Sequence, residues 1–371
     1  MTRRIDTIRL GDIIVVKDET NEDRLELPMI GINRDKEFMP TVANVSEVDI
    51  RKYKIVRPGY FVFSGMQTGR DVCIRLALYT DNNPSLISPA YTTFTVDETK
   101  GVFSEFLFMY FNRSEMDRYG WFISDSSVRS NLDWPRFLDI RIPKPSIDEQ
   151  RQFIQVWYQI QKMKEYNGAL AEPLFNLCQS KIQELKHNTP KIALSECIEQ
   201  CDQRNDDDRL GVDELRGVNS EGVFDSTRAK TDGLDFHNYK VVKPEDFAYN
   251  PSRINLGSIA KCQQECIVSP MYVVFRIKKE SQDILLADYL NIWFRRGEFQ
   301  RSTLFYASGS VRDTFSFAEM QRVLIPLPAI EVQKAIVDVF NCAQEAKHIS
   351  EEADMLSRDV CPALMQKVIN S

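Results

Sequence analysis

This chain repeats itself once, because segments of its first half recur about 183 to 186 residues further on. The clearest pair is Ile142-Pro-Lys-Pro-Ser-Ile-Asp-Glu-Gln150 and Ile325-Pro-Leu-Pro-Ala-Ile-Glu-Val-Gln333. Other pairs are Tyr53-Lys-Ile-Val-Arg-Pro58 with Tyr239-Lys-Val-Val-Lys-Pro244, and Ser127-Val-Arg129 with Ser310-Val-Arg312. Solenoid repeats are about 20–50 residues long, so this period is too long for a solenoid. The sequence therefore predicts a duplicated domain with its connector, which presents two similar faces.

Composition places the chain among ordinary globular proteins and restricts its partners. It has 371 residues, of which 43% are apolar and 27% charged, which is typical of a soluble protein. It has no apolar run as long as a membrane span and no signal-peptide core at its start, so we expect it to be cytoplasmic, with reduced cysteines. A net charge of −7 argues mildly against a simple nucleic-acid binder. Any tight DNA binding would then need other subunits or a few well-placed arginines.

Each copy divides into a mixed domain and a helical region. The expected domains are residues 1–145 and 189–328, and the helical regions are residues 146–188 and 329–371. Runs rich in β-branched and aromatic residues predict strands, and apolar residues at helical spacing predict helices. The strand-like runs are residues 13–16, 60–63 and 91–96, and single helices are expected at about 103–118 and 283–300. We expect an α+β fold with two duplicated α/β domains, each followed by a long helix.

The helical regions carry a narrow apolar seam in steps of three and four residues. A capping box of Ser146 and Glu149 marks the start of the first helix, while Pro173 and Pro362 predict a kink or restart. The seam residues expected to pair are Phe153, Ile160, Leu170, Leu174, Ile336, Phe340, Leu356 and Leu364. We expect the two helices to pair as an antiparallel coiled coil that separates the domains. The alternative is an amphipathic linker without a geometric role, which is disfavoured because the second helical region joins no following domain.

The order of these segments resembles that of the specificity (S) subunits of type I restriction–modification systems. The resemblance covers nearly the whole chain and rests on the two Pro-x-Pro-x-Ile-x-x-Gln junctions and on four further segments. These are Gly65-Met-Gln-Thr-Gly-Arg-Asp71, Phe247-Ala-Tyr-Asn-Pro-Ser-Arg-Ile-Asn-Leu-Gly-Ser258, Ile267-Val-Ser-Pro-Met-Tyr272 and Cys361-Pro-Ala-Leu-Met365. Each motif is weak alone, but together and in this order they are specific.

The resemblance implies a subunit without catalytic activity. Such a subunit binds a bipartite double-stranded DNA target, one half per recognition domain, and recruits two methyltransferase (M) subunits through its helical regions. Restriction (R) subunits can join the complex. S-adenosylmethionine and ATP would belong to these partners, so no cofactor is expected in this chain.

The chain offers little chemistry of its own. No Gly-rich nucleotide fingerprint follows a strand, and Asn250-Pro-Ser-Arg253 lacks the second proline and the aromatic of the amino-methyltransferase motif, so we interpret it as a loop. Four cysteines could form a zinc site: Cys197, Cys201, Cys262 and Cys266. The favoured alternative is that Cys197 is a small core residue on a short helix, because it aligns with Ile13. We therefore expect neither a catalytic site nor a metal.

The duplication sorts the candidate DNA contacts. Residues shared by both copies suit folding or phosphate contact, whereas residues that differ suit base readout. Arg129 and Arg312 are shared, which favours a phosphate or structural role. The divergent loops and a cluster of arginines on an expected helix supply the other candidates, for which an ordinary surface position is an equal alternative. These are Gln67, Thr68, Arg70, Arg253, Asn255, Ser258, Arg295, Arg296 and Arg301.

Two rival functions remain open from the sequence. The first is an S-like subunit that serves a single-polypeptide restriction–methylation enzyme, which the domain content of a neighbouring gene would reveal. The second is a coiled-coil interaction protein whose duplicated domains bind protein and have no DNA specificity. Competition binding among duplex sequences at fixed salt separates the second rival from a specificity subunit.

Overall fold

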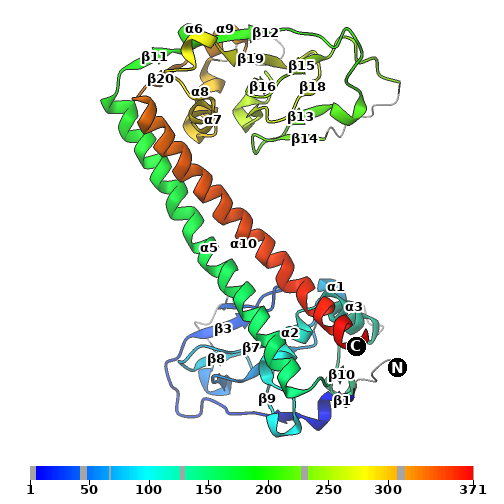
Figure 1. The fold of residues 1–371 in the computed structure, drawn as a ribbon. Helices are drawn as coiled ribbons and strands as arrows, with labels where there is room; N and C mark the ends of the chain where they lie inside the picture. The colour runs from blue at the N-terminus through cyan, green and yellow to red at the C-terminus, as the bar shows by residue number, and fades with distance from the viewer. Residues whose placement is uncertain are drawn as a thin grey trace. The chain divides into compact units, whose positions relative to one another are not determined.

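A computed structural model gives the fold of the chain (Figure 1). It describes residues 6–41, 48–66, 68–125, 130–226, 233–306 and 314–370, without the side chains of residues 69, 70, 358–362 and 364–370. The chain forms two compact units: residues 1–166 with 349–371, and residues 167–348. Each unit therefore combines one mixed domain with segments of both long helices.

In the first unit, short strands form an antiparallel sheet, a mixed sheet and a two-stranded ribbon. One sheet has the order β2-β9-β6-β7, a second has the order β4-β3-β8-β5, and β1 pairs with β10. The strands are β1 (Thr7–Arg9), β2 (Ile14–Val16), β3 (Met29–Ile32), β4 (Phe38–Pro40), β5 (Lys54–Val56), β6 (Phe61–Ser64), β7 (Arg75–Leu78), β8 (Ser85–Ile87), β9 (Thr92–Val96) and β10 (Arg141–Pro143). The helices are α1 (Thr68–Asp71), α2 (Ser104–Phe111), α3 (Ser114–Phe122) and α4 (Trp134–Asp139), with 3-10 turns at Leu10–Asp12, Ile50–Lys52 and Glu98–Lys100.

The second unit repeats this order of elements. Its sheet β12-β19-β16-β17 corresponds to β2-β9-β6-β7, and its ribbon β11-β20 corresponds to β1-β10. The strands are β11 (Lys191–Ala193), β12 (Ile198–Cys201), β13 (Arg216–Val218), β14 (Phe224–Ser226), β15 (Lys240–Val242), β16 (Phe247–Tyr249), β17 (Ile259–Lys261), β18 (Cys266–Val268), β19 (Val273–Ile277) and β20 (Leu324–Pro326). The helices are α6 (Leu194–Cys197), α7 (Ala287–Phe294), α8 (Gly297–Tyr306) and α9 (Phe317–Gln321), with 3-10 turns at Val212–Glu214, Ile254–Leu256 and Lys279–Ser281.

The same aromatic pair centres the core of each unit. Antiparallel pairing of β6 with β9 places Phe61 opposite Phe94, and their rings stack with centroids 5.0 Å apart. In the second unit, Phe247 lies opposite Phe275 and the rings stack at 5.1 Å. Directly opposed residues on one sheet face come into contact because side chains alternate between faces. The duplication is therefore exact to the register of the central strands.

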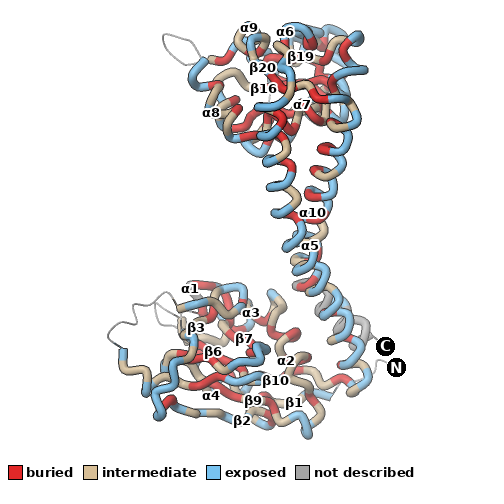
Figure 2. Tube along the Cα trace, turned by 90° about the vertical axis from the view of Figure 1, so that its left-hand side faces the viewer, coloured by how far each residue is buried: buried red, intermediate tan, exposed pale blue. Residues whose placement is uncertain are grey.

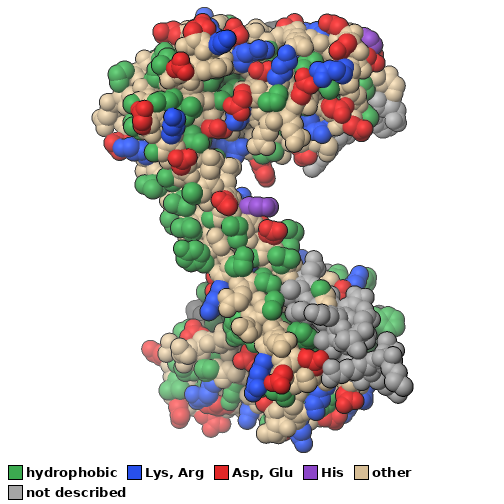
Figure 3. Space-filling model, in the orientation of Figure 1, with side chains coloured by type: hydrophobic (Ala, Val, Ile, Leu, Met, Phe, Trp, Pro, Cys, Tyr) green, Lys and Arg blue, Asp and Glu red, His purple; other side chains and the backbone are tan. Residues whose placement is uncertain are grey.

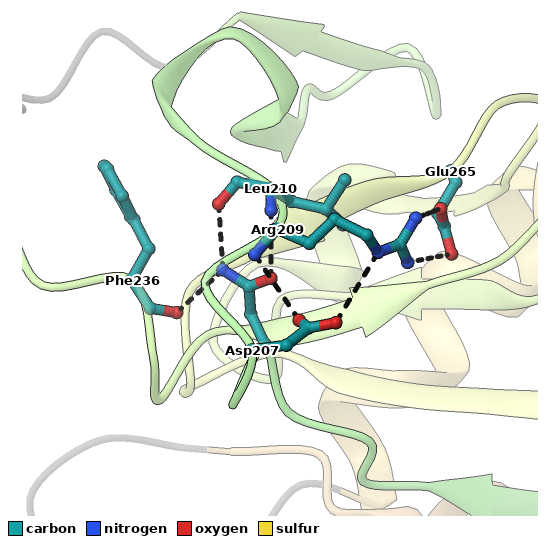
Figure 4. A network of polar contacts seen from close by, with 6 residues as sticks. Asp207, Arg209, Leu210, Phe236 and Glu265 are labelled. Carbon is teal, nitrogen blue, oxygen red and sulfur yellow. Dashed lines mark hydrogen bonds and ion pairs between the residues drawn. The ribbon is translucent and has the colours of Figure 1, made fainter.

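A buried asparagine also fixes one long loop in each unit. Asn205, which is 1% exposed, donates to the Leu210 carbonyl at 2.8 Å and accepts from the Leu210 N–H at 3.1 Å. In the first unit Asn21 makes the same two bonds to Leu25. The second loop gains a bidentate ion pair between Arg209 and Glu265, drawn in Figure 4. Both loops are therefore fixed by polar contacts as well as by apolar burial.

Two expected helices are each split in two. The expected helix at 103–118 is α2 followed by α3, and the one near 283–300 is α7 followed by α8. Each break falls at an arginine. Arg113 has an extended backbone at the start of α3 (φ −74, ψ 139), and Arg295 and Arg296 lie between α7 and α8. Periodicity alone did not reveal the break, since the apolar spacing continues across it. The strands expected at 13–16, 60–63 and 91–96 are confirmed as β2, β6 and β9 within one residue.

Both long helices are present, α5 (Ile147–Asn188) and α10 (Ile330–Asn370). The expected capping box is confirmed, because the Ser146 N–H donates to Glu149 Oε2 at 2.8 Å and the Glu149 N–H donates to Ser146 Oγ at 3.3 Å. The helix runs through Pro173, so of the expected kink or restart the restart is wrong. A proline removes one backbone hydrogen bond, and the rest of the helix keeps its own. None of the helices in the described ranges is both long and apolar enough to cross a bilayer.

The helices run antiparallel and touch within each unit. In the first unit, Ser350 Oγ donates to the Lys164 carbonyl at 2.9 Å. In the second unit, the rings of Phe175 and Phe340 lie 5.4 Å apart, and the Cys178 thiol lies 3.7 Å from the Ile336 carbonyl oxygen. The expected antiparallel pairing is confirmed by these contacts.

The buried seam differs from the expected one by one residue in part of α5. Phe153, Ile336 and Phe340 are buried as expected, and Ile160 and Leu174 are half-buried. However, Leu170 is 37% exposed and Leu356 is 47% exposed, so their expected pairing is wrong. The small residues Ala171, Cys178 and Ala353 fill the seam instead; Figure 2 shows buried positions recurring along both helices. The side chain of Leu364 lies outside the described part. The apolar pattern favoured large residues, whereas close helix packing selects small ones.

Candidate nucleic-acid interface

In the second unit, the candidate base-reading loop is residues 250–258, which join the inner strand β16 to β17. Asn250 opens a turn in which its Oδ1 accepts from the Ser252 N–H at 3.0 Å, so the loop expected at Asn250–Arg253 is confirmed. Gly257 then has φ +91, and a side chain there would collide with the Ser220 carbonyl. Only glycine adopts this conformation without strain. The turn is therefore held tightly and holds Arg253 at the surface.

The three candidates in this loop differ in exposure. Arg253 is exposed and Asn255 is half-buried, so both reach solvent. Ser258 is 2% exposed, and its hydroxyl donates to the Val218 carbonyl at 2.8 Å. A buried hydroxyl that already has a partner does not contact a base, so Ser258 holds the loop against β13.

The corresponding loop of the first unit contains α1, which packs against α3. Gly65 precedes it, and a side chain there would collide with the backbone of Leu132. Thr68 is 1% exposed, and its hydroxyl donates to the Gly65 carbonyl at 3.0 Å, so it also has a structural role. Gln67 and the side chain of Arg70 lie outside the described residues.

Arg296, a candidate DNA contact, is an internal residue. It is 5% exposed, its guanidinium carbon lies 4.6 Å from the centre of the Trp293 ring, and it pairs with Glu298 at 2.8 Å. Arg113 in the first unit repeats this arrangement, 4.9 Å from the Tyr110 ring and 3.5 Å from Glu115. The shared Arg-x-Glu sequence therefore joins two helices in each unit, and Arg296 is corrected from DNA contact to structural residue.

Arg295 is also drawn into the protein. Its Nη2 donates to the Gly222 carbonyl at 3.2 Å, and its guanidinium carbon lies 5.8 Å from the centre of the Phe340 ring. Burial lowers the pKa of this guanidinium. A charge that is desolvated in this way between α7 and α10 is poorly placed for a phosphate. Of the three clustered arginines, only Arg301 on α8 is exposed.

The shared arginines of the two Ser-Val-Arg segments, Arg129 and Arg312, lie outside the described residues. Their roles stay predictions from the sequence. On the face drawn in Figure 3, basic and acidic side chains are interspersed over the second unit, and hydrophobic side chains gather along α5 and α10.

A surface hollow lies at the base of a long helix in each unit. In the second unit a cavity of about 380 Å³ is lined by Asp288, Phe340 and Gln344, among others. In the first unit a cavity of about 540 Å³ is lined by Glu105, Trp157 and Gln161, among others. These residues correspond one to one at the repeat distance. The internal repeat therefore extends from the core to the surface.

The four cysteines considered for zinc do not come together. Cys201, Cys262 and Cys266 belong to one core cluster, in which the sulfur atoms of Cys262 and Cys266 lie 3.9 Å apart. Cys197 belongs to a separate cluster with Leu194 and Ile198. Within the described ranges, no three His, Cys, Asp or Glu side chains group as metal ligands. Cys197 is fully buried on α6, as the structural alternative expects.

Sequence reasoning missed two groups of shared residues. One is the glutamine of each Pro-x-Pro-x-Ile-x-x-Gln junction, Gln150 and Gln333, which is fully buried. The other is an exposed pair near the end of α3 and of α8, Arg118 with Phe122 and Arg301 with Phe305, of which only Arg301 was a candidate from the sequence. Aligning α3 with α8 position by position would have found both members of this pair.

Comparison with known proteins gives structural matches only. No family model matches the sequence, and neither does any curated protein. The HsdS subunit from Thermoanaerobacter tengcongensis is 14% identical, with 99% of this chain and 96% of that chain covered and a TM-score of 0.42. A chain from a structure of a type I restriction–modification system, described by its complex assembly and conformational transition, is 14% identical, with 100% and 99% covered and a TM-score of 0.47.

A third match carries the comparison. The S subunit of a type I restriction–modification system from M. genitalium is 12% identical and covers 99% of this chain and 97% of its own, with a TM-score of 0.57. Identity this low speaks for the fold and not for the activity. The likeness extends over both mixed domains and both long helices. The chain therefore has the fold of the S subunit of a type I restriction–modification system.

Proposed function

We propose that this chain is the specificity subunit of a type I restriction–modification system. In this role each mixed domain reads one half of a bipartite duplex sequence. The proposal rests on one observation: the chain has the fold of an S subunit, and its two copies share a scaffold but differ in their surface loops. Arg253 and Asn255 are the base-reading candidates that reach solvent in the second unit. Arginine and asparagine side chains make the bidentate contacts that distinguish guanine and adenine in the major groove.

Methyltransferase subunits are the proposed protein partners. On α5, Leu170 (37% exposed) and Leu177 (55% exposed) lie outside the buried seam and are spaced by seven residues. An apolar row that the chain's own packing leaves exposed is typical of a protein-binding surface. Each unit has an equivalent hollow, one beside Trp157 and one beside Phe340. Two copies of the same partner could therefore make the same contact, one in each unit. R subunits would join through that complex, and catalysis would belong to the partners.

Exchanging one domain tests whether each domain reads one half-site. Residues 1–145 would be replaced by the corresponding domain of another specificity subunit, and the complex with the methyltransferase subunit would be assayed by mapping methylated sites. We expect one half-site to change and the other to stay. Unchanged methylation, or loss of all sequence preference in competition binding at fixed salt, would overturn the proposal and favour the protein-interaction rival.

The long helices are proposed to set the distance between the half-sites. Inserting one heptad in α5 after Lys164 and one in α10 beside Ser350, whose hydroxyl donates to the Lys164 carbonyl, keeps the pairing in register. The gap between methylated half-sites should then lengthen. An unchanged gap would remove this role from the helices.

The rival of a single-polypeptide enzyme predicts that the partner carries nuclease and methyltransferase domains in one chain, which mass spectrometry of the complex distinguishes.

A further inference from the structure

Two phenylalanines are exposed at equivalent positions of the two units. Phe122 ends α3 and Phe305 lies one residue before the end of α8, and each is 83% exposed. They lie 183 residues apart, which is the repeat distance. Single exposed apolar side chains are common on protein surfaces. Here, however, the same large aromatic residue is equally exposed at the equivalent position of both copies, which indicates that both positions contact a partner.

An exposed arginine precedes each phenylalanine by one helical turn. The Arg118 side chain is 70% exposed, and Arg301 is also exposed. Residues four apart lie on the same face of a helix, so guanidinium and ring form one small surface on each helix. This surface, Arg118 with Phe122 and Arg301 with Phe305, is called the Arg–Phe surface below.

Internal contacts account for only part of the Arg–Phe surface, because the Arg118 guanidinium also lies 3.6 Å from the Glu115 carboxylate. Over the aligned helices, from Ser114 and from Gly297 onward, the two copies are identical only at the glutamate, the arginine and the phenylalanine. The glutamates, Glu115 and Glu298, hold the internal arginines Arg113 and Arg296. The other two identities face solvent in both units. A role in folding therefore explains the glutamate, whereas the arginine and the phenylalanine keep exposed side chains in both units.

The Arg–Phe surface lies beside the candidate base-reading loop in each unit. Helix α8 packs against the 3-10 turn Ile254–Leu256, which follows Arg253, and α3 packs against α1. The loops differ between the copies, whereas the Arg–Phe surface is the same. Shared contacts hold a protein on any duplex, and divergent ones read its sequence. The occupant must also present two equivalent sites and attract a cation.

We propose that each Arg–Phe surface binds duplex DNA, with the phenylalanine inserted against a base step and the arginine on the adjoining phosphate. The inference rests on the proposed function and adds a contact that does not depend on base identity. Proteins commonly kink DNA by inserting an apolar side chain between bases while arginines hold the backbone. Phe122 and Phe305 thus unstack one step in each half-site, next to the loop that reads it.

The test uses the full chain in complex with its methyltransferase subunit and duplexes that carry the target. Affinity would be measured by fluorescence anisotropy over a range of salt for Phe122→Ala, Phe305→Ala and the double variant. Each single substitution should weaken binding about tenfold, the magnitude of one lost aromatic–base stack, without changing the salt slope. Arg118→Ala and Arg301→Ala should instead each reduce that slope by about 0.9, as for one lost phosphate contact.

A second readout reports the insertion itself. With 2-aminopurine moved step by step through each half-site, the wild-type complex should brighten at one step per half-site. Phe122→Ala should abolish the signal in one half-site and Phe305→Ala in the other. Val16→Ala and Met271→Ala serve as matched controls, because these side chains are 55% and 56% exposed and are not repeated in the other copy. Both controls should leave affinity and fluorescence unchanged.

The outcomes separate this inference from the proposed function. If the wild-type complex shows no sequence preference, the proposed function fails. If it is sequence-selective but the phenylalanine variants keep full affinity and the 2-aminopurine signal, the insertion is wrong and the proposed function stands. If the variants lose the methyltransferase subunit on co-purification, the surface docks protein, which also overturns the inference. Thermal melting of each variant checks that folding is intact.

Discussion

The side-chain oxygen of Gln150 accepts a hydrogen bond from the backbone N–H of Phe103 at 3.0 Å, which ties the first turn of α5 to the start of α2. Its amide nitrogen donates to the carbonyls of Gly101 and Pro145. Gln333 does the same in the second unit, accepting from the Leu286 N–H at 2.9 Å and donating to Ile284 and Pro328. Both glutamines are fully buried. The repeated junction motif is therefore a joint between a domain and its long helix.

Removing this joint should destabilise the fold. Gln150→Leu keeps the volume but leaves one backbone N–H and two carbonyls without their partner, which costs about 2–4 kcal/mol. Gln155→Leu, at an exposed position on the same helix, should change the free energy of unfolding by less than about 0.5 kcal/mol. Denaturant unfolding of both variants measures the difference. Equal stability of the two variants would contradict the role of the joint.

The corrected seam makes a sharp prediction for two adjacent residues of α5. Ala171 is 7% exposed and Leu170 is 37% exposed. Ala171→Asp buries an unpaired carboxylate and should cost about 3 kcal/mol or more, whereas Leu170→Asp should cost under about 1 kcal/mol. Chemical denaturation monitored by circular dichroism would compare them. The opposite ranking would restore the seam expected from the apolar pattern.

Arg296 should matter for stability and Arg301 should not. Arg296→Met loses hydrogen bonds to Gln183 and Glu298, both at 2.8 Å, together with its contact to Trp293. Charged hydrogen bonds contribute about 1.5–3 kcal/mol each at most, so a loss of about 2–3 kcal/mol is expected. Arg301→Met should melt like the wild type. Reduced DNA affinity of Arg296→Met at unchanged stability would return Arg296 to the interface.

Asp246 should give a pH-dependent effect. Its side chain is 6% exposed, and burial raises the pKa of its carboxyl above the usual value of 3.8 even though Arg276 lies 3.4 Å away. Folding therefore favours the protonated form, and the stability this contributes is lost as pH rises through the folded pKa. Asp246→Asn should melt higher than wild type at neutral pH, and the gain should shrink as pH falls toward 3.8. A variant less stable than wild type at neutral pH would mean that the pair with Arg276 outweighs burial.

Arg253 is the sharpest base-reading candidate. Arg253→Ala should weaken binding of the partner complex by about 1–3 kcal/mol and relax preference at one base position of one half-site. Arg322→Ala, also exposed in the second unit, is the matched control and should leave the preference intact. Binding to a library randomised at each position measures this. A uniform loss across all positions would identify Arg253 as a phosphate contact.

Local sequence signals predicted the elements well where they act through near neighbours. The Ser146–Glu149 capping box fixes the start of α5 because both partners lie within one turn. The break at Arg113 was not predicted, because the apolar spacing of α2 continues into α3. In the site, the sequence identified the loop around Arg253, but it did not show that Ser258 is buried while Arg253 is exposed.

The sequence by itself determined the duplication, the order of domains and helices, and the positions at which the two copies agree. Only the tertiary structure decided what each agreement is for. Arg296 and Arg301 look alike in the sequence, yet one is 5% exposed against Trp293 and the other faces solvent. The physical reason is that burial depends on which distant segments pack over a residue. Repetition records that a residue is kept in both copies, and packing determines whether it serves the fold or meets a partner.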